Sequence, residues 1–162
     1  MRPILAAALA LAMGAIASAK ESPSTARRQQ PRTAPGGEKT LISTSDAPKP
    51  IGPYSQGIVS SGFMFASGQI PIDPKTNELV QGDIGTQTEQ VMKNLLAVLK
   101  EAKMGPENVV KTTVYLVDLA DFPRMNEVYG HFFGQQRPAR STIQAAALPR
   151  GARIEVDMIA AY

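Results

Sequence analysis

The strand-like segment VVKTTVYLV at residues 109–117 constrains the fold of this chain more than any other segment. Its β-branched and aromatic residues are typical of a strand. Because alternate residues point to opposite faces, one face would carry Val110, Thr112, Val114 and Leu116, and the other Lys111, Thr113, Tyr115 and Val117. Neither face is convincingly polar, whereas an antiparallel sheet with one solvated face alternates cleanly. The segment therefore predicts a sheet that is covered on both sides.

Two other segments show helical periodicity. After Asp83, small and apolar residues recur at three- and four-residue spacing, at Thr88, Val91, Leu95, Val98 and Ala102. Asp83 is predicted to cap this helix, and Gly105-Pro106 is predicted to end it. A shorter helix is predicted after Asp121, through FPRMNEVYGHFFG, where a proline is tolerated in the first turn and a glycine lies near the end.

Strands are predicted around TLIST, QGIVSSG, FMFASG, VVKTTVYLVDL, STIQAAAL and RIEVDMIAA. The order of strands, helix, strand, helix and strands predicts an α+β domain, with a mixed sheet and both helices packed on one face. Two helices cannot also cover the second face of that sheet. We therefore expect other subunits to cover it.

The first 38 residues differ from the rest in composition. The opening MRPILAAALALAMGAIASAKES combines a cation, an apolar run and the small-residue site Ala17-Ser18-Ala19. This pattern predicts a cleaved signal peptide over residues 1–19 and a periplasmic or secreted protein. The apolar run is shorter than the roughly 20 residues that a membrane anchor needs. Residues 20–38 contain no Val, Ile, Leu or aromatic residue, which predicts a flexible linker before a domain at residues 39–162.

The composition excludes several kinds of site. The chain has no cysteine and a single histidine, His131, so a cysteine zinc site, a thiolate nucleophile and a multi-histidine metal site are impossible. No glycine-rich phosphate loop is present. The formal net charge of +3 falls to +2 once Arg2 leaves with the signal peptide, too small a surplus for a basic nucleic-acid surface. We expect no metal, no nucleic-acid partner and no stable membrane anchor.

Two charged positions near the end of the chain call for an explanation. Arg140, in PARSTIQ, begins a predicted strand, and a buried cation is costly unless an anion meets it. A surface salt bridge, a structural partner or a ligand carboxylate could each be that anion. In RIEVDMIA the apolar residues share one face, so Glu155 and Asp157 share the other. A carboxylate there is either part of an interface ion pair or a general acid/base with a raised pKa.

Weaker candidates lie at strand ends and turns. Tyr54 follows Gly52-Pro53 in IGPYSQG, and Ser67-Gly68 in FASGQIP would let a ligand approach backbone amides. Asn126, in RMNEVY, could hydrogen-bond a ligand. Each also has an ordinary structural interpretation, as a core-edge tyrosine, a turn glycine and a helix-surface amide. These residues alone leave both interpretations open.

Taken together, the segments IGPYSQG, SGQIPIDPKTNELV, VVKTTVYLVDLADFPRMNEVYGHFF, PARST and LPRGARIEVDMIA resemble the RidA/YjgF family of reactive-intermediate imine deaminases. The resemblance runs from about Ile42 onward. It implies a chorismate-mutase-like fold and a homotrimer with active sites between subunits. It also implies cofactor-free hydrolysis of 2-imino acids and their enamine tautomers, such as 2-iminobutanoate and 2-iminopropanoate, to 2-keto acids and ammonia.

The resemblance also implies roles for single residues. Arg140 would clamp the substrate carboxylate, and Glu155 would position the attacking water. Asp157 stands where many relatives carry a glutamate, and Thr142 stands where many carry a cysteine. The implied substrate-binding residues are Tyr54, Ser67, Gly68, Asn126 and Thr142.

Other functions stay open beside the deaminase. One is a non-catalytic module that binds a small carboxylate or acts as a chaperone. Another is an endoribonuclease of the perchloric-acid-soluble kind, against which the small positive charge and the lack of a basic stripe argue.

The pairing of the last two strands bears on all of these functions. A simple hairpin around PRGA would put Glu155 opposite Ala146, with Arg140 six residues away, or roughly 20 Å at about 3.3 Å per residue. Such a hairpin could not bring both charges onto one small substrate. Either the strands pair differently or the two groups meet across an interface.

Overall fold

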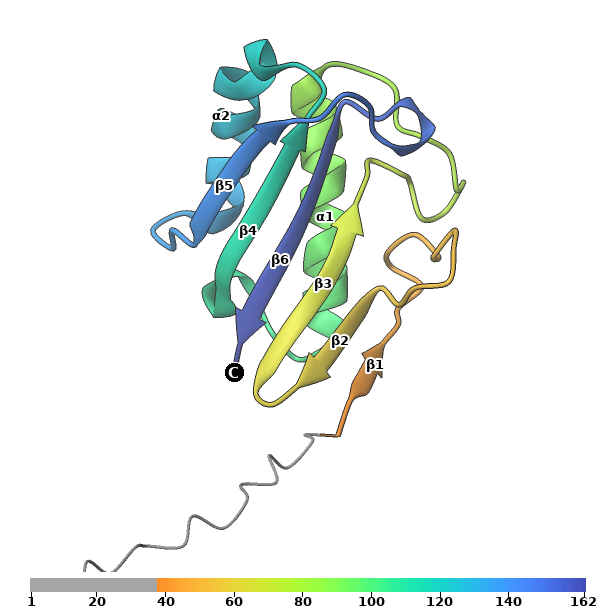
Figure 1. Ribbon diagram of the computed structural model, residues 1–162, viewed down its shortest axis with the longest axis vertical. Helices are drawn as coiled ribbons and strands as arrows, with labels where there is room; N and C mark the ends of the chain where they lie inside the picture. The colour runs from red at the N-terminus through yellow and green to blue at the C-terminus, as the bar shows by residue number, and fades with distance from the viewer. Residues whose placement is uncertain (1–37) are drawn as a thin grey trace, which may run out of the picture. The chain divides into compact units, whose positions relative to one another are not determined.

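The computed structural model describes residues 38–162, which form one six-stranded sheet with two helices (Figure 1). The predicted signal peptide and all but the last residue of the predicted linker lie outside the described residues. The strands are β1 Thr40–Ile42, β2 Gly57–Ser60, β3 Phe63–Gln69, β4 Val109–Leu116, β5 Ala139–Gln144 and β6 Ile154–Ala161. The α-helices are α1 Ile84–Glu101 and α2 Phe122–Phe133, and short 3-10 turns lie at Pro106–Asn108, Leu119–Asp121 and Pro149–Gly151.

Both helices form where their periodicity predicts them. Asp83 caps α1, because its carboxylate accepts hydrogen bonds from the backbone N–H and the hydroxyl of Thr86, at 2.8 and 2.7 Å. The predicted stripe on α1 is buried throughout. Helix α2 carries Pro123 in its first turn and is capped by Gly134, whose φ of 53° favours a glycine. Among the described residues, neither helix is long and apolar enough to cross a membrane.

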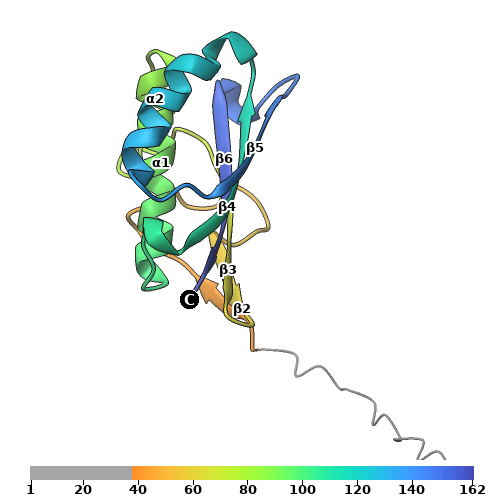
Figure 2. The same cartoon turned by 90° about the vertical axis from the view of Figure 1, so that its left-hand side faces the viewer.

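The sheet is mixed, in the order β1-β2-β3-β6-β4-β5, and both helices cover the same face of it (Figure 2). The core lies between these layers, where Val91, Leu95 and Val98 of α1 meet Val156 and Met158 of β6, all fully or nearly fully buried. Burial of such side chains contributes about 1.5–3 kcal/mol each. The predicted α+β class, with both helices on one face, is confirmed.

The pairing of the last two strands differs from a hairpin. Strand β5 runs parallel to β4, while β6 lies antiparallel between β3 and β4, so β5 and β6 are not neighbours. The predicted strand STIQAAAL also begins earlier and ends earlier, at Ala139 and Gln144. The chain leaves the sheet after Gln144 because a loop must carry it around the end of β4, from the edge of the sheet to its centre.

The second face of the sheet bears large apolar side chains that no described part of the chain covers. Phe63, Phe65 and Ile143 are each close to half exposed, at 45, 48 and 49%. Between them lie polar groups, including Tyr115, whose hydroxyl donates to Asp157 at 3.1 Å. We call this side of the sheet the open face. An exposed apolar surface of this kind marks an interaction site.

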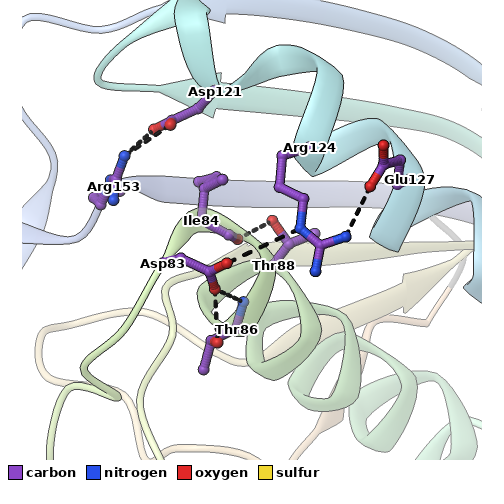
Figure 3. A network of polar contacts seen from close by, with 8 residues as sticks. All are labelled: Asp83, Ile84, Thr86, Thr88, Asp121, Arg124, Glu127 and Arg153. Atoms are coloured by element: carbon purple, nitrogen blue, oxygen red, sulfur yellow. Dashed lines mark hydrogen bonds and ion pairs between the residues drawn. The ribbon is translucent and has the colours of Figure 1, made fainter.

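A polar network joins the beginnings of α1, α2 and β6 (Figure 3). The guanidinium of Arg153 donates to both oxygens of Asp121, at 2.7 and 2.8 Å. Arg124 forms an ion pair with Glu127 at 2.7 Å and a longer one with Asp83 at 4.0 Å. Both bonds to Asp121 come from the same guanidinium nitrogen, Nη2. These contacts link the start of α2 to the start of α1 and to the residue that precedes β6.

Candidate functional site

Arg140 and Glu155 lie on opposite faces of the sheet. Arg140 of β5 pairs in register with Thr112 of β4, whose side chain is fully buried on the helix-covered face. Glu155 of β6 alternates with Ile154 and Val156, which are fully buried on that same helix-covered face. Glu155 therefore points to the open face. Within one chain, the two charges cannot contact the same small molecule.

Arg140 is held on the helix-covered side by two aromatic rings of α2. Its guanidinium carbon lies 4.7 Å from the centroid of Tyr129 and 5.5 Å from that of Phe122, which are cation–π distances. Tyr129 is itself fixed, since its hydroxyl shares a hydrogen bond of 2.8 Å with Thr112. Burial raises the pKa of Tyr129, which keeps the phenol neutral. The two rings thus orient the arginine, which forms no ion pair with a carboxylate of residues 38–162.

A cavity of about 390 Å³ opens beside this arginine. Asn126 and Tyr129 of α2 line one part of it, and Arg137, Pro138 and Arg140 line another. Two of the predicted residues, Asn126 and Arg140, therefore share one cavity. We call it the arginine cavity. Its donors are suited to an anion such as a carboxylate.

Replacing Tyr129 tests the support of Arg140. In Tyr129→Leu the guanidinium loses a ring, so we expect binding of the carboxylate 2-oxobutanoate to weaken about 3- to 30-fold. Tyr129→Phe keeps the ring and should bind nearly as well as the parent chain. Titration calorimetry measures both, and a thermal melt shows whether each variant is folded. Equal affinity in a folded Tyr129→Leu protein would contradict this role.

The second group of predicted residues lines another cavity, of about 340 Å³. Tyr54, Ser67, Gly68 and Glu155 border it, and so does Pro149. We call it the glutamate cavity. A Cβ at Gly68 would overlap the Glu155 carboxylate, so this position requires glycine if the carboxylate is to keep its place. The sequence named four of these residues, and only the family resemblance implied that they share a site.

The carboxyl group of Glu155 sits in an unusual electrostatic setting. Burial raises its pKa above the ordinary value, and the neighbouring charge of Asp157 raises it further. Burial likewise raises the pKa of Tyr115, with the charge of Asp157 adding to the effect. A carboxylate whose ionised form is disfavoured is a better base, and a perturbed acid in a cavity is a candidate for proton transfer.

One buried amide, missed by sequence reasoning, holds the wall of the glutamate cavity. The Gln56 side chain is 2% exposed and accepts from the backbone N–H of Thr44 at 2.7 Å. It also donates to the carbonyls of Thr44, Ala47 and Pro48, at 3.0, 3.2 and 2.8 Å. These bonds fix the loop that precedes Tyr54. A polar residue three positions after Gly52-Pro53 was the available signal, but it pointed equally to a solvated side chain.

Thr142 lies outside both cavities. It follows Arg140 by two residues on the same face of β5, and its half-buried side chain has a hydroxyl oxygen with no hydrogen-bond partner among residues 38–162. The structure thus puts Thr142 near Arg140 without bringing it to the cavity wall. His131 is exposed on α2. Within the described part of the chain, no group of three or more histidine, aspartate or glutamate residues could hold a metal ion.

Comparisons with known proteins agree with this geometry. The family model described as endoribonuclease L-PSP matches residues 44–162. A RutC family protein of Pyrococcus horikoshii is 52% identical over 122 residues, covering 75% of this chain and 97% of that protein. The human 2-iminobutanoate/2-iminopropanoate deaminase is 44% identical over 122 residues, covering 75% of this chain and 89% of that enzyme. The crystal structure of a putative endoribonuclease from Thermotoga maritima has a TM-score of 0.75 at 50% identity, covering 76% of this chain and 97% of that one.

Proposed function

This chain belongs to the endoribonuclease L-PSP family, which is also the RidA/YjgF family, and from that premise we propose that it is a hydrolytic deaminase of 2-imino acids. Its substrates would be small 2-imino acids and their enamine tautomers, such as 2-iminobutanoate and 2-iminopropanoate. The products are the 2-keto acid and ammonia. The observation that carries the proposal is a ring-stacked arginine in one cavity and a carboxyl group with a raised pKa in another.

The chemistry needs a carboxylate clamp and a positioned water. The planar guanidinium of Arg140 can hold the substrate carboxylate through two parallel hydrogen bonds. Water then adds its oxygen to the imine carbon, while Glu155 accepts a proton from that water. The same carboxyl group returns that proton to the nitrogen, which gives a carbinolamine. A second proton passes from the carbinolamine hydroxyl to the nitrogen, and the C–N bond breaks as the C=O bond forms, so that ammonia and the 2-keto acid leave. Because the imine carbon is already electrophilic, positioning supplies much of the rate.

The opposite orientation of the two charges determines how the site is built. A substrate that touches Arg140 and Glu155 must lie between two copies of the chain, one presenting its arginine cavity and the other its glutamate cavity. The open face offers the surface for such packing, and β5, which carries Arg140, is an edge strand. We propose a closed homotrimer, in which every chain gives an arginine to one neighbour and a glutamate to the other.

Light scattering tests this assembly. We expect the chain to have the mass of three protomers at micromolar concentration. Phe65→Asp, which puts a charge on the open face, should shift the mass toward the monomer. Leu119→Asp makes the same change at a side chain of similar exposure, 45% against 48%, outside the sheet, and should leave the trimer intact. A monomeric parent chain would contradict the shared site.

An assay of two activities separates the deaminase from the alternatives. Imino acid is generated in solution by an amino acid oxidase, and keto acid release is followed with and without the protein. The same preparation is incubated with RNA, because the matching family model carries a ribonuclease description. Faster keto acid release with intact RNA supports the deaminase. RNA cleavage alone supports the ribonuclease, and neither activity supports a binding or chaperone module.

A further inference from the structure

The arginines of residues 38–162 fall into two groups. Arg124, Arg150 and Arg153 each form an ion pair with a carboxylate of the chain, at 2.7, 3.7 and 2.7 Å. Arg137 and Arg140 form no ion pair with any described residue, and both line the arginine cavity. The two arginines that lack an anion thus lie in the same place.

The arginine cavity has no negative charge to balance them. None of its lining residues is an aspartate or glutamate, and its other polar side chains include the neutral amides of Asn126 and Gln136. Two guanidinium groups three residues apart, in a concave site of about 390 Å³, produce a positive potential that favours anions. A single carboxylate held by Arg140 neutralises only one of them.

Arg137 and Arg140 also differ in how firmly the surrounding side chains hold their guanidinium groups. Arg140 is half-buried and stacked on Tyr129 and Phe122, so the position of its guanidinium is set. Arg137 is exposed, precedes Pro138 and stacks on no described ring. Its guanidinium can therefore move to contact a group further along a ligand. A fixed guanidinium suits the carboxylate next to the imine, which all these substrates share. A mobile guanidinium suits a side-chain group whose distance from the imine varies between substrates.

We propose that Arg137 makes this site selective for 2-imino acids that carry a second carboxylate on a side chain of one or two methylene groups. The inference rests on the proposed deaminase function. Arg140 would hold the carboxylate next to the imine, and Arg137 would hold the distal one. The reaction is unchanged: water adds to the imine carbon, the C–N bond breaks, and a keto dicarboxylate and ammonia form. The reaction that supplies such a substrate is the two-electron oxidation of an acidic amino acid.

The test compares a monoacid with a diacid. Hydrolysis of 2-iminobutanoate and of 2-iminoglutarate is measured for the parent chain, for Arg137→Gln and for Lys93→Gln. Lys93 is exposed on α1, away from both cavities, so its variant matches the change in net charge. We expect the parent chain to favour the diacid by about two- to fivefold in kcat/KM, the range for a solvent-exposed ion pair. Arg137→Gln should lose that preference, because its kcat/KM should fall about two- to fivefold more for the diacid than for the monoacid. Lys93→Gln should keep the preference.

Calorimetry with the products 2-oxobutanoate and 2-oxoglutarate gives a second measurement that needs no turnover. A preference for binding the diacid that is lost only in Arg137→Gln supports the proposal, whether or not the imines are hydrolysed. Absence of imine hydrolysis would refute the deaminase function separately. Equal binding of the two acids by the parent chain overturns the proposal. An equal loss of affinity for both acids in Arg137→Gln also overturns it, because Arg137 would then bind the carboxylate that both acids share. Dissociation of the Arg137→Gln oligomer overturns it too, because Arg137 would then belong to the subunit interface.

Discussion

Arg140→Ala is expected to abolish imine hydrolysis, lowering kcat/KM by about 100- to 1000-fold. The guanidinium is the only cation that the structure holds rigidly in the arginine cavity, where it lies 4.7 Å from the centroid of the Tyr129 ring. Without it, the substrate carboxylate meets a ring and a neutral amide in place of two charge-assisted hydrogen bonds. Keto acid formation from enzymatically generated 2-iminobutanoate measures the loss.

A conservative variant shows which property of the arginine matters. Arg140→Lys keeps the charge but cannot form two parallel hydrogen bonds, so we expect it to recover little activity. Size-exclusion chromatography and a thermal melt must show that both variants remain folded and assembled. Near-normal hydrolysis by Arg140→Ala would contradict the clamp. Loss of activity together with loss of the oligomer would instead make Arg140 a structural residue.

Glu155→Gln should have the second-largest effect, and mainly on kcat. The amide has nearly the same shape as the carboxylate but cannot accept a proton from water, so turnover should fall by about 100- to 10,000-fold while KM changes little. A rise in KM with unchanged kcat would show that Glu155 binds substrate and does not handle the water.

The pH profile provides an independent check on Glu155. Only the ionised carboxylate accepts a proton, so kcat/KM should rise with pH through the pKa of Glu155, which burial and then Asp157 place above the ordinary value. Removing the charge in Asp157→Asn should move this acid limb to lower pH, since that charge disfavours ionisation of its neighbour. Glu155→Gln should abolish the limb. An unchanged limb in Glu155→Gln would assign it to another group.

Local patterns predicted the elements of the fold well but not their pairing. The stripe from Thr88 to Ala102 and the cap at Asp83 are properties of neighbouring residues, so one helix with one buried face satisfies them. The pairing of β5 is not local. Helix α2 carries the chain back across the sheet, so that β5 runs parallel to β4 at the edge, and no residue within STIQAAAL reports that crossover.

In the candidate site, too, single residues could be predicted from the sequence but their arrangement could not. Single residues such as Arg140, Glu155 and Gly68 stand out by charge or by the lack of a side chain, and the resemblance to a family supplied their roles. The faces on which they lie depend on strand register, which only the folded chain shows. Residues that act through others were missed altogether. Tyr129 looked like any residue of an amphipathic helix, although it orients Arg140.

The central claim is that each site combines the arginine of one chain with the glutamate of another. It is tested most directly by mixing Arg140→Ala protein with Glu155→Gln protein, each inactive alone, unfolding them together and refolding them. Random assortment gives about one quarter of the sites an intact arginine from one chain and an intact glutamate from its neighbour. We expect recovery of about one quarter of the parent activity, with mixed trimers visible by native mass spectrometry. Mixed trimers that hydrolyse no imine would contradict it.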